Sequence, residues 1–374
     1  MKIGVMTEFK VSLIDLKERY IEEREELLSC VERVLESGNF VLTPELEAFE
    51  ERIATYTGSK HCVGLNSGTD ALMMGLMAMG VGRDDEVITS PISFVASTAA
   101  IVHIGATPVY VDVGEDQNID PSKIEEKITP QTKAIMPVHW TGRISDMREI
   151  NKIAARNNLS VIEDSCQCMG AKYYEQHAGT FGKVGTFSGH PLKAMNAIGD
   201  AGFLITNDDT IANKIRIYRN HGLIDRDTCV EYGVNSRLDV LHATILLYRL
   251  GKLSSIIERR RTNVNLYRKL IKAKEVYIPP CKEYEENAFV MFLVQAERRD
   301  ELKIFLEERG IQSLVYYAKA LHLQPAAKRY NYKRGDFPVA EKQADTVLAL
   351  PHHQHLSSEQ ITLVANSVNE FYKL

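Results

Sequence analysis

The sequence predicts an α/β fold, in which a mostly parallel sheet has helices on both faces and a smaller α/β domain follows it. Short β-branched runs alternate with helical stretches from residue 58 onward, the pattern of strands joined by crossover helices. The chain has 374 residues, more than one hydrophobic core usually fills. Its residues are 44% hydrophobic and 25% charged, as in globular proteins. We therefore expect a large domain over residues 1–250 and a small one over residues 251–374.

The first expected element is an amphipathic helix from Val11 to Leu35, where apolar residues recur at helical spacing. The strands of the sheet should then be His61–Leu65, Glu86–Thr89, Thr107–Val111, Ala134–Val138, Ser160–Glu163, Thr186–Ser188 and Gly202–Thr206. A long helical region from about Leu238 to Lys272 leads into the small domain. That domain should combine Ala288–Gln295 and Ile311–Tyr316 with a helix over Arg299–Arg309.

The last helix has a start that can be read from the sequence. Ser357 and Gln360 have the spacing of a capping box, in which each side chain bonds the other residue's backbone N–H. Leu356 and Ile361 flank this pair at the positions of a hydrophobic staple. We expect a helix to begin just after Ser357.

Composition also excludes several classes of protein. A net charge of −5 argues against nucleic acid as a partner, because phosphate binding depends on a basic surface. Residues 1–8 lack the apolar core of a secretory signal, and apolar runs such as Ala288–Val294 are too short to span a bilayer. The six cysteines lack disulfide or metal spacing. We expect a cytoplasmic protein with reduced thiols and no membrane partner.

A candidate phosphate site lies at Ser67, Gly68 and Thr69. These residues follow a predicted strand and open a helix, and the first turn of a helix presents unpaired N–H donors and a positive dipole end. An ordinary glycine-containing turn is the alternative. The methionine-rich stretch behind this turn, residues 73–79, is expected to pack in the core.

Asp164 ends the predicted strand at 160–163, where a buried carboxylate needs a cationic partner. A protonated pyridine nitrogen would be such a partner, and Gln167 lies close behind; a helix cap is the alternative. Phe94 could lie flat on a planar cofactor, although a lone aromatic residue beside a strand is more often part of the core.

Lys193 stands between a turn at 188–190 and a turn at 199–202. Pyridoxal 5′-phosphate (PLP) needs an amine to hold it as a Schiff base and a carboxylate to keep its ring nitrogen protonated. Lys193 and Asp164 are therefore the candidate catalytic pair, and Ser188 offers a second hydroxyl to the phosphate. The combination predicts a PLP site.

These motifs resemble the DegT-type sugar aminotransferase family, whose members are PLP enzymes of fold type I. The resemblance runs from about Asn39 to the C-terminus. The matching motifs are Asn66–Leu72, Gly105–Asp112, Glu163–Gln167, Phe187–Ser188 with Lys193, Arg219–Gly222, Asn235–Leu238, Leu321–Pro325 and Leu350–Pro351. The resemblance implies an aspartate aminotransferase-like fold with a large, mixed, mostly parallel sheet.

The resemblance also implies a role for each matching residue. Lys193 would hold the cofactor and shuttle protons, Asp164 would pair with the ring nitrogen and Gln167 would bond the ring hydroxyl. Asn235 would reach the phosphate of the neighbouring subunit's cofactor, which implies a homodimer. The other expected cofactor contacts are Ser67, Gly68, Thr69, Phe94 and Ser188, and the candidate substrate contacts are His190, Arg237, Tyr317 and His322.

Three positions depart from the family pattern. Many members carry an aromatic residue where Gly189 stands, a glycine where Ala201 stands, and a proline where Ala318 stands. These positions flank the expected substrate site. They bear on the identity of the substrate more than on the cofactor.

The expected activity is ping-pong transamination from L-glutamate to a keto-deoxysugar that carries a nucleotide. A cyclitol ketone or a small phosphorylated keto compound is an alternative acceptor. A sugar dehydratase on the same fold would have histidine in place of Lys193, and a non-catalytic regulatory protein would lose cofactor residues that are present here.

The segment His352-His353-Gln354-His355 resembles a metal cluster in composition only. It lies between Pro351 and the start of the last helix. We expect it to form a polar loop near the active site and to bind no metal.

Overall fold

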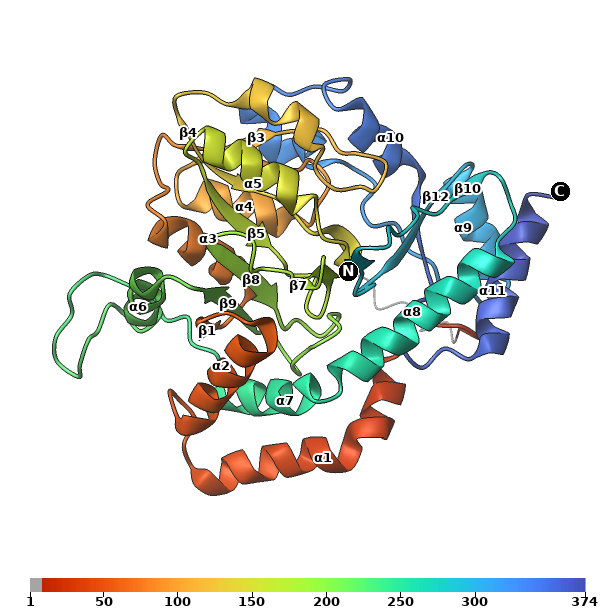
Figure 1. The fold of residues 1–374 in the computed structure, drawn as a ribbon. Helices are drawn as coiled ribbons and strands as arrows, with labels where there is room; N and C mark the ends of the chain where they lie inside the picture. Colours follow the sequence, from red (N-terminus) through yellow and green to blue (C-terminus); the bar gives the residue numbers. More distant parts are fainter. Residues whose placement is uncertain (1–8, 374) are drawn as a thin grey trace.

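The computed structural model describes residues 9–373, and Figure 1 shows its architecture. The expectation that no secretory signal opens the chain concerns residues 1–8, which lie outside the described residues. A seven-stranded sheet forms the centre, with the strand order β1 (His61–Leu65), β9 (Gly202–Thr206), β8 (Val184–Ser188), β5 (Ser160–Asp164), β4 (Thr132–Met136), β2 (Glu86–Thr89) and β3 (Thr107–Tyr110). Strand β9 is antiparallel to both of its neighbours, and the other pairings are parallel. The predicted fold class is confirmed.

Helices cover both faces of the sheet because its strands are apolar on both sides. The helices on one face are α2 (Pro44–Thr57), α5 (Met147–Arg156) and α7 (Val240–Leu250). Those on the other are α3 (Gly68–Ala78), α4 (Val95–His103) and α6 (Asp209–Tyr218). Successive residues of a strand serve opposite faces: Val161 of β5 packs in the first cluster and Ile162 in the second.

A second sheet of three strands lies beyond the central one. Its strands are β10 (Val276–Tyr277), β12 (Phe292–Ala296) and β13 (Val347–Leu350), and the helices packed with it are α8 (Leu253–Leu270), α9 (Arg299–Glu308) and α11 (Ser358–Phe371). Ile311–Tyr316 is not a strand of this sheet and makes only isolated bridges, from Ile311 to Val11 and from Leu314 to Ala349. The division at residue 250 stays a prediction.

The remaining elements are short. They are the strands β6 (Lys172–Tyr173), β7 (Gln176–His177) and β11 (Glu285–Glu286), the helix α10 (Pro338–Thr346), and 3-10 turns at Pro121–Lys123, Glu125–Lys127, Trp140–Gly142, Leu321–Leu323 and Pro325–Tyr330. The capping box at the start of α11 is confirmed, because Ser357 and Gln360 bond each other's backbone N–H groups. Leu356 and Ile361 pack in the same buried cluster, as the staple predicts.

Helix α1 (Leu16–Ser37) begins later than predicted, after the N-cap Asp15, and runs along α7 (Figure 1). The predicted apolar stripe is partly wrong, because Tyr20 and Ile21 are exposed whereas Arg19 and Glu23 are buried. The covered face combines this polar pair with Leu27, Cys30 and Val34, so apolar spacing alone reveals only part of it.

The predicted helical region from 238 to 272 is two helices, α7 and α8, with a bend of 59° between them. Within residues 9–373, no single helix has the length and apolar character needed to cross a membrane; the bent α7–α8 pair meets that requirement only when its two helices are taken together.

Candidate active site

Three strands of the central sheet bring the predicted site residues to one edge. Helix α3 starts directly after β1, Asp164 ends β5 and Ser188 ends β8. Ligands of open α/β sheets collect outside the carboxyl ends of the parallel strands. Ser67, Gly68 and Thr69 therefore lie at the same edge of the sheet as Asp164 and Ser188.

The start of α3 packs closely against the residues at the ends of β5 and β8. The Ser67 hydroxyl caps the helix by accepting the N–H of Asp70 at 3.1 Å. A Cβ atom on Gly68 would lie 2.9 Å from both the Cys166 Sγ and the Ser188 Cβ, so glycine is required here. The first turn of α3 thus lies against the ends of β5 and β8, and its N–H groups and positive dipole end suit an anion there.

Asp164 is buried, and neutral donors hold its carboxylate in place. Its Oδ2 accepts the Ser97 hydroxyl of α4 at 2.6 Å, and its Oδ1 accepts the N–H of Cys166 at 3.2 Å. The Ser93 hydroxyl lies 2.6 Å from that of Ser97 and extends the chain. A buried carboxylate with only neutral donors suits a cationic partner such as a protonated ring nitrogen.

Lys193 lies in the loop between β8 and β9, close to Cys166 and Asp164. Burial lowers the pKa of the Lys193 amine from its usual range, and Cys166 and Asp164 act in the opposite direction. A lowered pKa increases the fraction of neutral amine, the form that attacks an aldehyde or accepts a proton.

Gln167 is buried beside a short turn. Its Oε1 accepts the N–H of Thr141 at 2.9 Å, which directs the amide group away from solvent. The neighbouring Trp140 ring lies 5.8 Å from the Tyr317 ring, and the Phe94 ring lies 5.9 Å from Tyr317 on another side. Phe94 is 51% exposed, so it is not part of the core and its ring remains available for stacking.

The candidate substrate residues lie in different surroundings. His190 is exposed, and partial desolvation of its ring together with the charge of Lys193 lowers its pKa. Arg237 donates to the Asn220 Oδ1 at 3.0 Å, and Asn235 is exposed. Burial raises the pKa of Tyr317 to about 12, so its hydroxyl stays protonated.

His322 differs from these residues because it is only 2% exposed. Its Nε2 lies 3.0 Å from Glu341, and the rings of Tyr110, Tyr332 and Phe337 surround it. Burial lowers the pKa of His322 and Glu341 opposes the shift. The structure places His322 in a buried aromatic cluster beside Tyr110 and not at the open surface.

Sequence reasoning missed three groups at this site. Ser97 bonds Asp164 and also lies 2.6 Å from the hydroxyl of Ser93, which precedes α4; its place as a polar residue in the largely apolar α4 was the available signal. Cys166, for which we expected no more than a reduced thiol, packs against Gly68, and burial raises the pKa of its thiol well above the usual range. Trp140 packs beside Tyr317, and the rings of Trp140, Tyr317 and Phe94 together form an aromatic wall.

Glu163, the neighbour of Asp164 on β5, is buried and accepts hydrogen bonds from several segments of the chain. Its carboxylate accepts three backbone N–H groups, from Gly179, Phe181 and Gly182, at 2.7–2.8 Å. The Nε2 of His139 lies 2.8 Å from it, and the N–H of Ser145 bonds the other ring nitrogen of His139. These bonds tie the segment before β8 to the end of β5.

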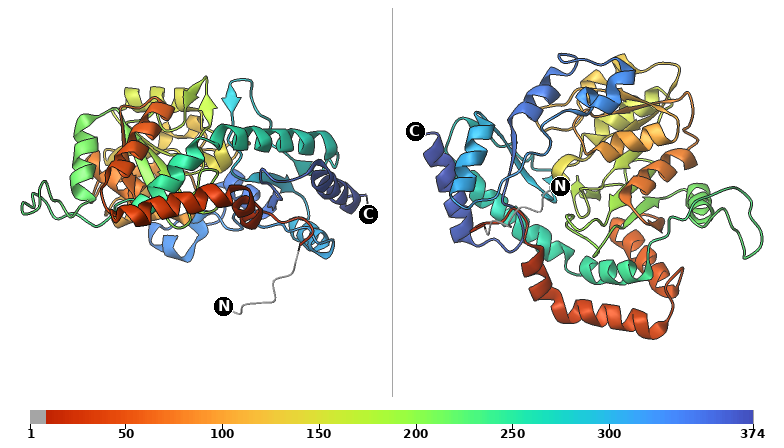
Figure 2. Two further views of the ribbon diagram at one scale, coloured as in Figure 1. Left: turned by 90° about the horizontal axis from the view of Figure 1, so that it is seen from below. Right: turned by 180° about the vertical axis from the view of Figure 1, so that it is seen from behind.

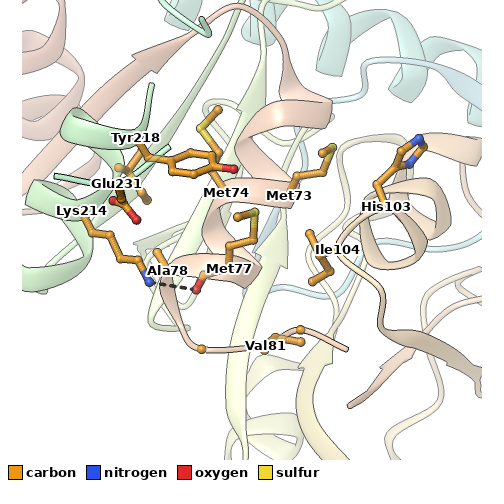
Figure 3. Close-up of a pocket in the computed structure, with 13 residues that line it drawn as sticks. Met73, Met74, Met77, Ala78, Val81, His103, Ile104, Lys214, Tyr218 and Glu231 are labelled. Atoms are coloured by element: carbon orange, nitrogen blue, oxygen red, sulfur yellow. Dashed lines mark hydrogen bonds between the residues drawn. The ribbon is translucent and has the colours of Figure 1, made fainter. Parts of the chain in front are cut away.

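A hollow of about 550 Å³ lies away from these residues, between α3, α4 and α6 (Figure 3). Met73 and Met77 line it together with His103, Lys214 and Tyr218. The expectation that the methionine-rich stretch packs in the core is therefore only partly correct.

The histidine-rich loop after β13 packs against other polypeptide segments. The His352 Nε2 lies 2.9 Å from the Phe289 carbonyl oxygen, and the His355 Nδ1 lies 3.1 Å from Glu22 of α1. In the part of the chain that the structure describes, no group of three or more His, Cys, Asp or Glu residues is arranged to hold a metal ion.

Fold and site together are those of an aminotransferase, and comparison with known proteins agrees. A model of the DegT/DnrJ/EryC1/StrS aminotransferase family matches residues 21–369, and the chain belongs to this family. A pleiotropic regulatory protein of Geobacillus stearothermophilus is 39% identical over 97% of this chain and 99% of that protein. A dTDP-3-amino-3,4,6-trideoxy-alpha-D-glucose transaminase of Streptomyces venezuelae is 38% identical over 97% of this chain and 96% of that protein.

Two solved structures extend the comparison. The crystal structure of S. venezuelae DesV in complex with a ketimine intermediate has a TM-score of 0.95 and 38% identity, covering 98% of this chain and all of that one. The structure of NtdA from Bacillus subtilis with bound cofactor PMP has a TM-score of 0.87 and 32% identity, covering 94% of this chain and 82% of that one.

Proposed function

We propose that this chain is a PLP-dependent aminotransferase that moves an amino group from L-glutamate to a nucleotide-linked keto-deoxysugar. The convergence of the Lys193 amine and the Asp164 carboxylate beside the start of α3 carries this proposal. The family membership and the similarity to a dTDP-sugar transaminase support the reaction class and the substrate class.

The residues present fit the cofactor. Gly68, without a side chain, lets the first turn of α3 pack directly against Cys166 and Ser188, which brings the N–H groups of the helix start beside the Ser188 hydroxyl, where a phosphate can bind. Asp164 is a buried carboxylate without a permanent cation other than the nearby Lys193. When bound, PLP supplies an electron sink that stabilises a carbanion at the substrate carbon.

Each remaining residue then has a physical task. Ser67, Thr69 and Ser188 contribute hydroxyl or N–H donors to the phosphate, and Gln167 bonds the ring hydroxyl. Phe94 stacks on the ring. After release from the cofactor, the Lys193 amine moves a proton at the substrate carbon, a step that its lowered pKa favours.

The substrate site is proposed along the aromatic wall. Tyr317 faces it with a protonated hydroxyl, and His190 and Arg237 offer polar contacts from the loops beside Lys193 and Asn235. His322 acts from behind this wall, by holding Tyr110 in place. L-glutamate as donor is the ordinary expectation for this class of transferase.

We further propose a homodimer. The segment between α6 and α7 stands out from the body of the molecule (Figures 1 and 2). On this segment, Ile224, Val230 and Tyr232 are 55%, 54% and 97% exposed. A monomer rarely exposes several large apolar side chains together, and such a patch marks an interaction site. Asn235 closes this segment by bridging to Asn220. A second copy that covers these side chains would receive Asn235 near its cofactor phosphate.

Other readings are less well supported. A regulatory protein would not need the Lys193 amine beside Asp164, although one relative carries a regulatory name. A cyclitol ketone or a small phosphorylated keto compound stays an alternative acceptor, because the departures at Gly189 and Ala201 lie next to Lys193. A cytoplasmic location remains the proposal that fits nucleotide-linked substrates.

The test is conversion of keto-deoxysugars linked to dTDP or UDP, with L-glutamate and PLP, followed by mass spectrometry of the amino-sugar product. The wild type should form product and Lys193→Ala should not. Absence of product with every nucleotide sugar, but conversion of a cyclitol ketone, would replace the proposed acceptor.

Complementation tests the shared site. Lys193→Ala and Asn235→Ala are each expected to be inactive or weak alone. Mixed dimers would contain one site with intact Lys193 and intact Asn235 from the two chains, so activity should return on mixing. If Asn235 serves its own chain, mixing restores nothing.

A further inference from the structure

A buried ionic group joins α1 and α7 at a place that the proposed reaction does not use. It consists of Arg19 and Glu23 of α1 and Arg249 of α7, which are 3%, 5% and 4% exposed. The Arg249 Nε and Nη2 donate to the Glu23 Oε2 at 2.9 and 2.7 Å. The Arg19 Nε lies 3.2 Å from the Glu23 Oε1. One carboxylate thus orders two guanidinium groups.

Each arginine also directs its Nη1 group at the loop that carries Lys193. The Arg249 Nη1 donates to the carbonyl oxygen of Asn196 at 2.7 Å and lies 3.4 Å from that of Ala197. The Arg19 Nη1 donates to the carbonyl oxygen of Ala194 at 3.2 Å. Three carbonyl groups within four residues after Lys193 are therefore fixed by side chains from two helices.

The side chain of Asn196 extends this support to the other side of Lys193. Its Nδ2 donates to the carbonyl oxygen of Pro191 at 2.6 Å, and its Oδ1 accepts the Arg249 Nη1 at 3.1 Å. Asn196 is 2% exposed. The backbone is thus held both before and after Lys193, through one arginine.

We propose that Arg249 is a positioning residue that fixes where the Lys193 amine lies. Glu23, which also binds Arg19, holds the Arg249 guanidinium in place, and Asn196 extends its hydrogen bonds to the backbone before Lys193. This inference rests on the proposed function, because it assumes that Lys193 holds the cofactor. It makes α1 part of the support of the active site.

The distribution of donors favours positioning over simple helix packing. Burying charges is costly unless their hydrogen bonds are satisfied, and an apolar contact would join two helices at least as well. Here the Nη1 groups of Arg249 and Arg19, which Glu23 leaves free, are used on the Lys193 loop, whereas the Arg19 Nη2 has no partner among the described residues. A planar guanidinium can bond a carboxylate and carbonyl groups at once, which a lysine ammonium cannot match in geometry.

A neighbouring pair supplies the matched control. Arg259 of α8 bonds Glu22 of α1 at 3.3 Å, so it also joins α1 to a helix through a glutamate. Its side chain is 49% exposed, and its hydrogen bonds go to Glu22. Arg259→Lys therefore changes the same residue type, and the same kind of contact to a glutamate of α1, without touching the 194–197 carbonyls.

The experiment compares two properties of cofactor-free protein. The first is the rate at which added PLP forms the visible absorption band of the lysine-bound cofactor. The second is the affinity for pyridoxine 5′-phosphate, which has the ring and the phosphate but no aldehyde and so cannot react with Lys193. The proteins are wild type, Arg249→Lys, Asn196→Ala, Arg259→Lys and Lys193→Ala.

The expected result is a roughly tenfold to hundredfold slower attachment of PLP in Arg249→Lys and a smaller slowing in Asn196→Ala, since a misplaced reacting group loses about that much. Their affinity for pyridoxine 5′-phosphate should equal that of the wild type, and Arg259→Lys should match the wild type in both properties. Asn196→Ala leaves the ionic group intact. Its rate of PLP attachment therefore tests the proposal even if Arg249→Lys does not fold.

Two patterns overturn the inference. Equal losses in attachment rate and in pyridoxine 5′-phosphate affinity would mean a merely structural role, and unchanged attachment in both variants would mean no role. If the wild type forms no band, or if Lys193→Ala still forms it, the proposed function itself fails and this inference fails with it.

Discussion

A Cβ atom on Gly189 would lie 2.8 Å from the Cβ atom of Ala201, and the N–H of Gly189 bonds the Ala201 carbonyl oxygen at 2.7 Å. The two residues face each other where the Lys193 loop leaves β8 and enters β9. Only one of them can carry a side chain without movement of the backbone. The two departures from the family pattern at these positions, a missing aromatic residue and an added methyl group, therefore compensate each other.

This relationship predicts coupling between the two sites. Gly189→Ala should lower the free energy of unfolding by about 1–3 kcal/mol, because it adds a methyl group to a filled space. Combination with Ala201→Gly should recover most of that loss, which urea unfolding of the four proteins measures. Strictly additive losses would show that the two positions do not compete for space.

A second prediction concerns the phosphate site. Gly68→Ala places a methyl group 2.9 Å from the Cys166 Sγ and the Ser188 Cβ, so the start of α3 must move away from the ends of β5 and β8. We expect affinity for PLP to fall by roughly tenfold or more, since placement of donors around an anion is sensitive to small shifts. Gly82→Ala, where no atom lies within 4 Å of the new Cβ, is the control in an equilibrium titration. Equal affinities in the two variants would exclude Gly68 from the phosphate site.

The pKa of Lys193 predicts a pH dependence. Burial lowers this pKa, so the neutral amine should dominate at lower pH than for an exposed lysine of pKa about 10.4. The rate of PLP attachment should rise with pH and level off below that value. Asp164→Asn removes a negative neighbour that raises the pKa, so its profile should shift to still lower pH. A shift toward higher pH would contradict this electrostatic picture.

The same shift affects stability. The unfolded chain binds the Lys193 proton more tightly than the folded chain does, so this residue makes folding more favourable as pH rises from its lowered pKa to about 10.4. Lys193→Met, in the absence of cofactor, should remove this part of the pH dependence of unfolding. An unchanged slope would mean that the amine is not buried.

Glu163 should matter for stability more than for chemistry. Glu163→Gln replaces an acceptor of three backbone N–H groups by an amide whose NH₂ opposes some of them. A loss of about 2–4 kcal/mol is expected, because buried donors are left unpaired. Glu125→Gln, which removes the exposed partner of Arg156, should cost no more than about 1 kcal/mol. Thermal and urea unfolding distinguish these outcomes. Similar losses of stability in both variants would contradict the stabilising role of the hydrogen bonds to Glu163.

Much of the fold could be predicted because its signals are local. Strands such as Gly202–Thr206 are rich in apolar and β-branched residues and are bounded by turns. The start of α3 is indicated by Ser67, its N-cap, and by Gly68. The covered face of α1 could be predicted only in part, because Glu23, which pairs with Arg19, finds its partner Arg249 more than 200 residues further along the chain.

The site shows the same division. Lys193 and Asp164 stand in recognisable motifs, and the structure brings them together. Ser97 was missed because its bond to Asp164 joins residues 67 positions apart. His322 was expected near the substrate, yet its surroundings depend on Glu341 and on Tyr110 from β3, contacts that no local pattern encodes.

The most direct test of the account is to locate the cofactor on the chain. The protein loaded with PLP is reduced with borohydride, which fixes the link between an amine and the cofactor, and its peptides are analysed by mass spectrometry. The account predicts the added pyridoxyl mass on the peptide that contains Lys193, and its loss from that peptide when L-glutamate is added before reduction. Modification of another lysine, or of none, would contradict the central claim.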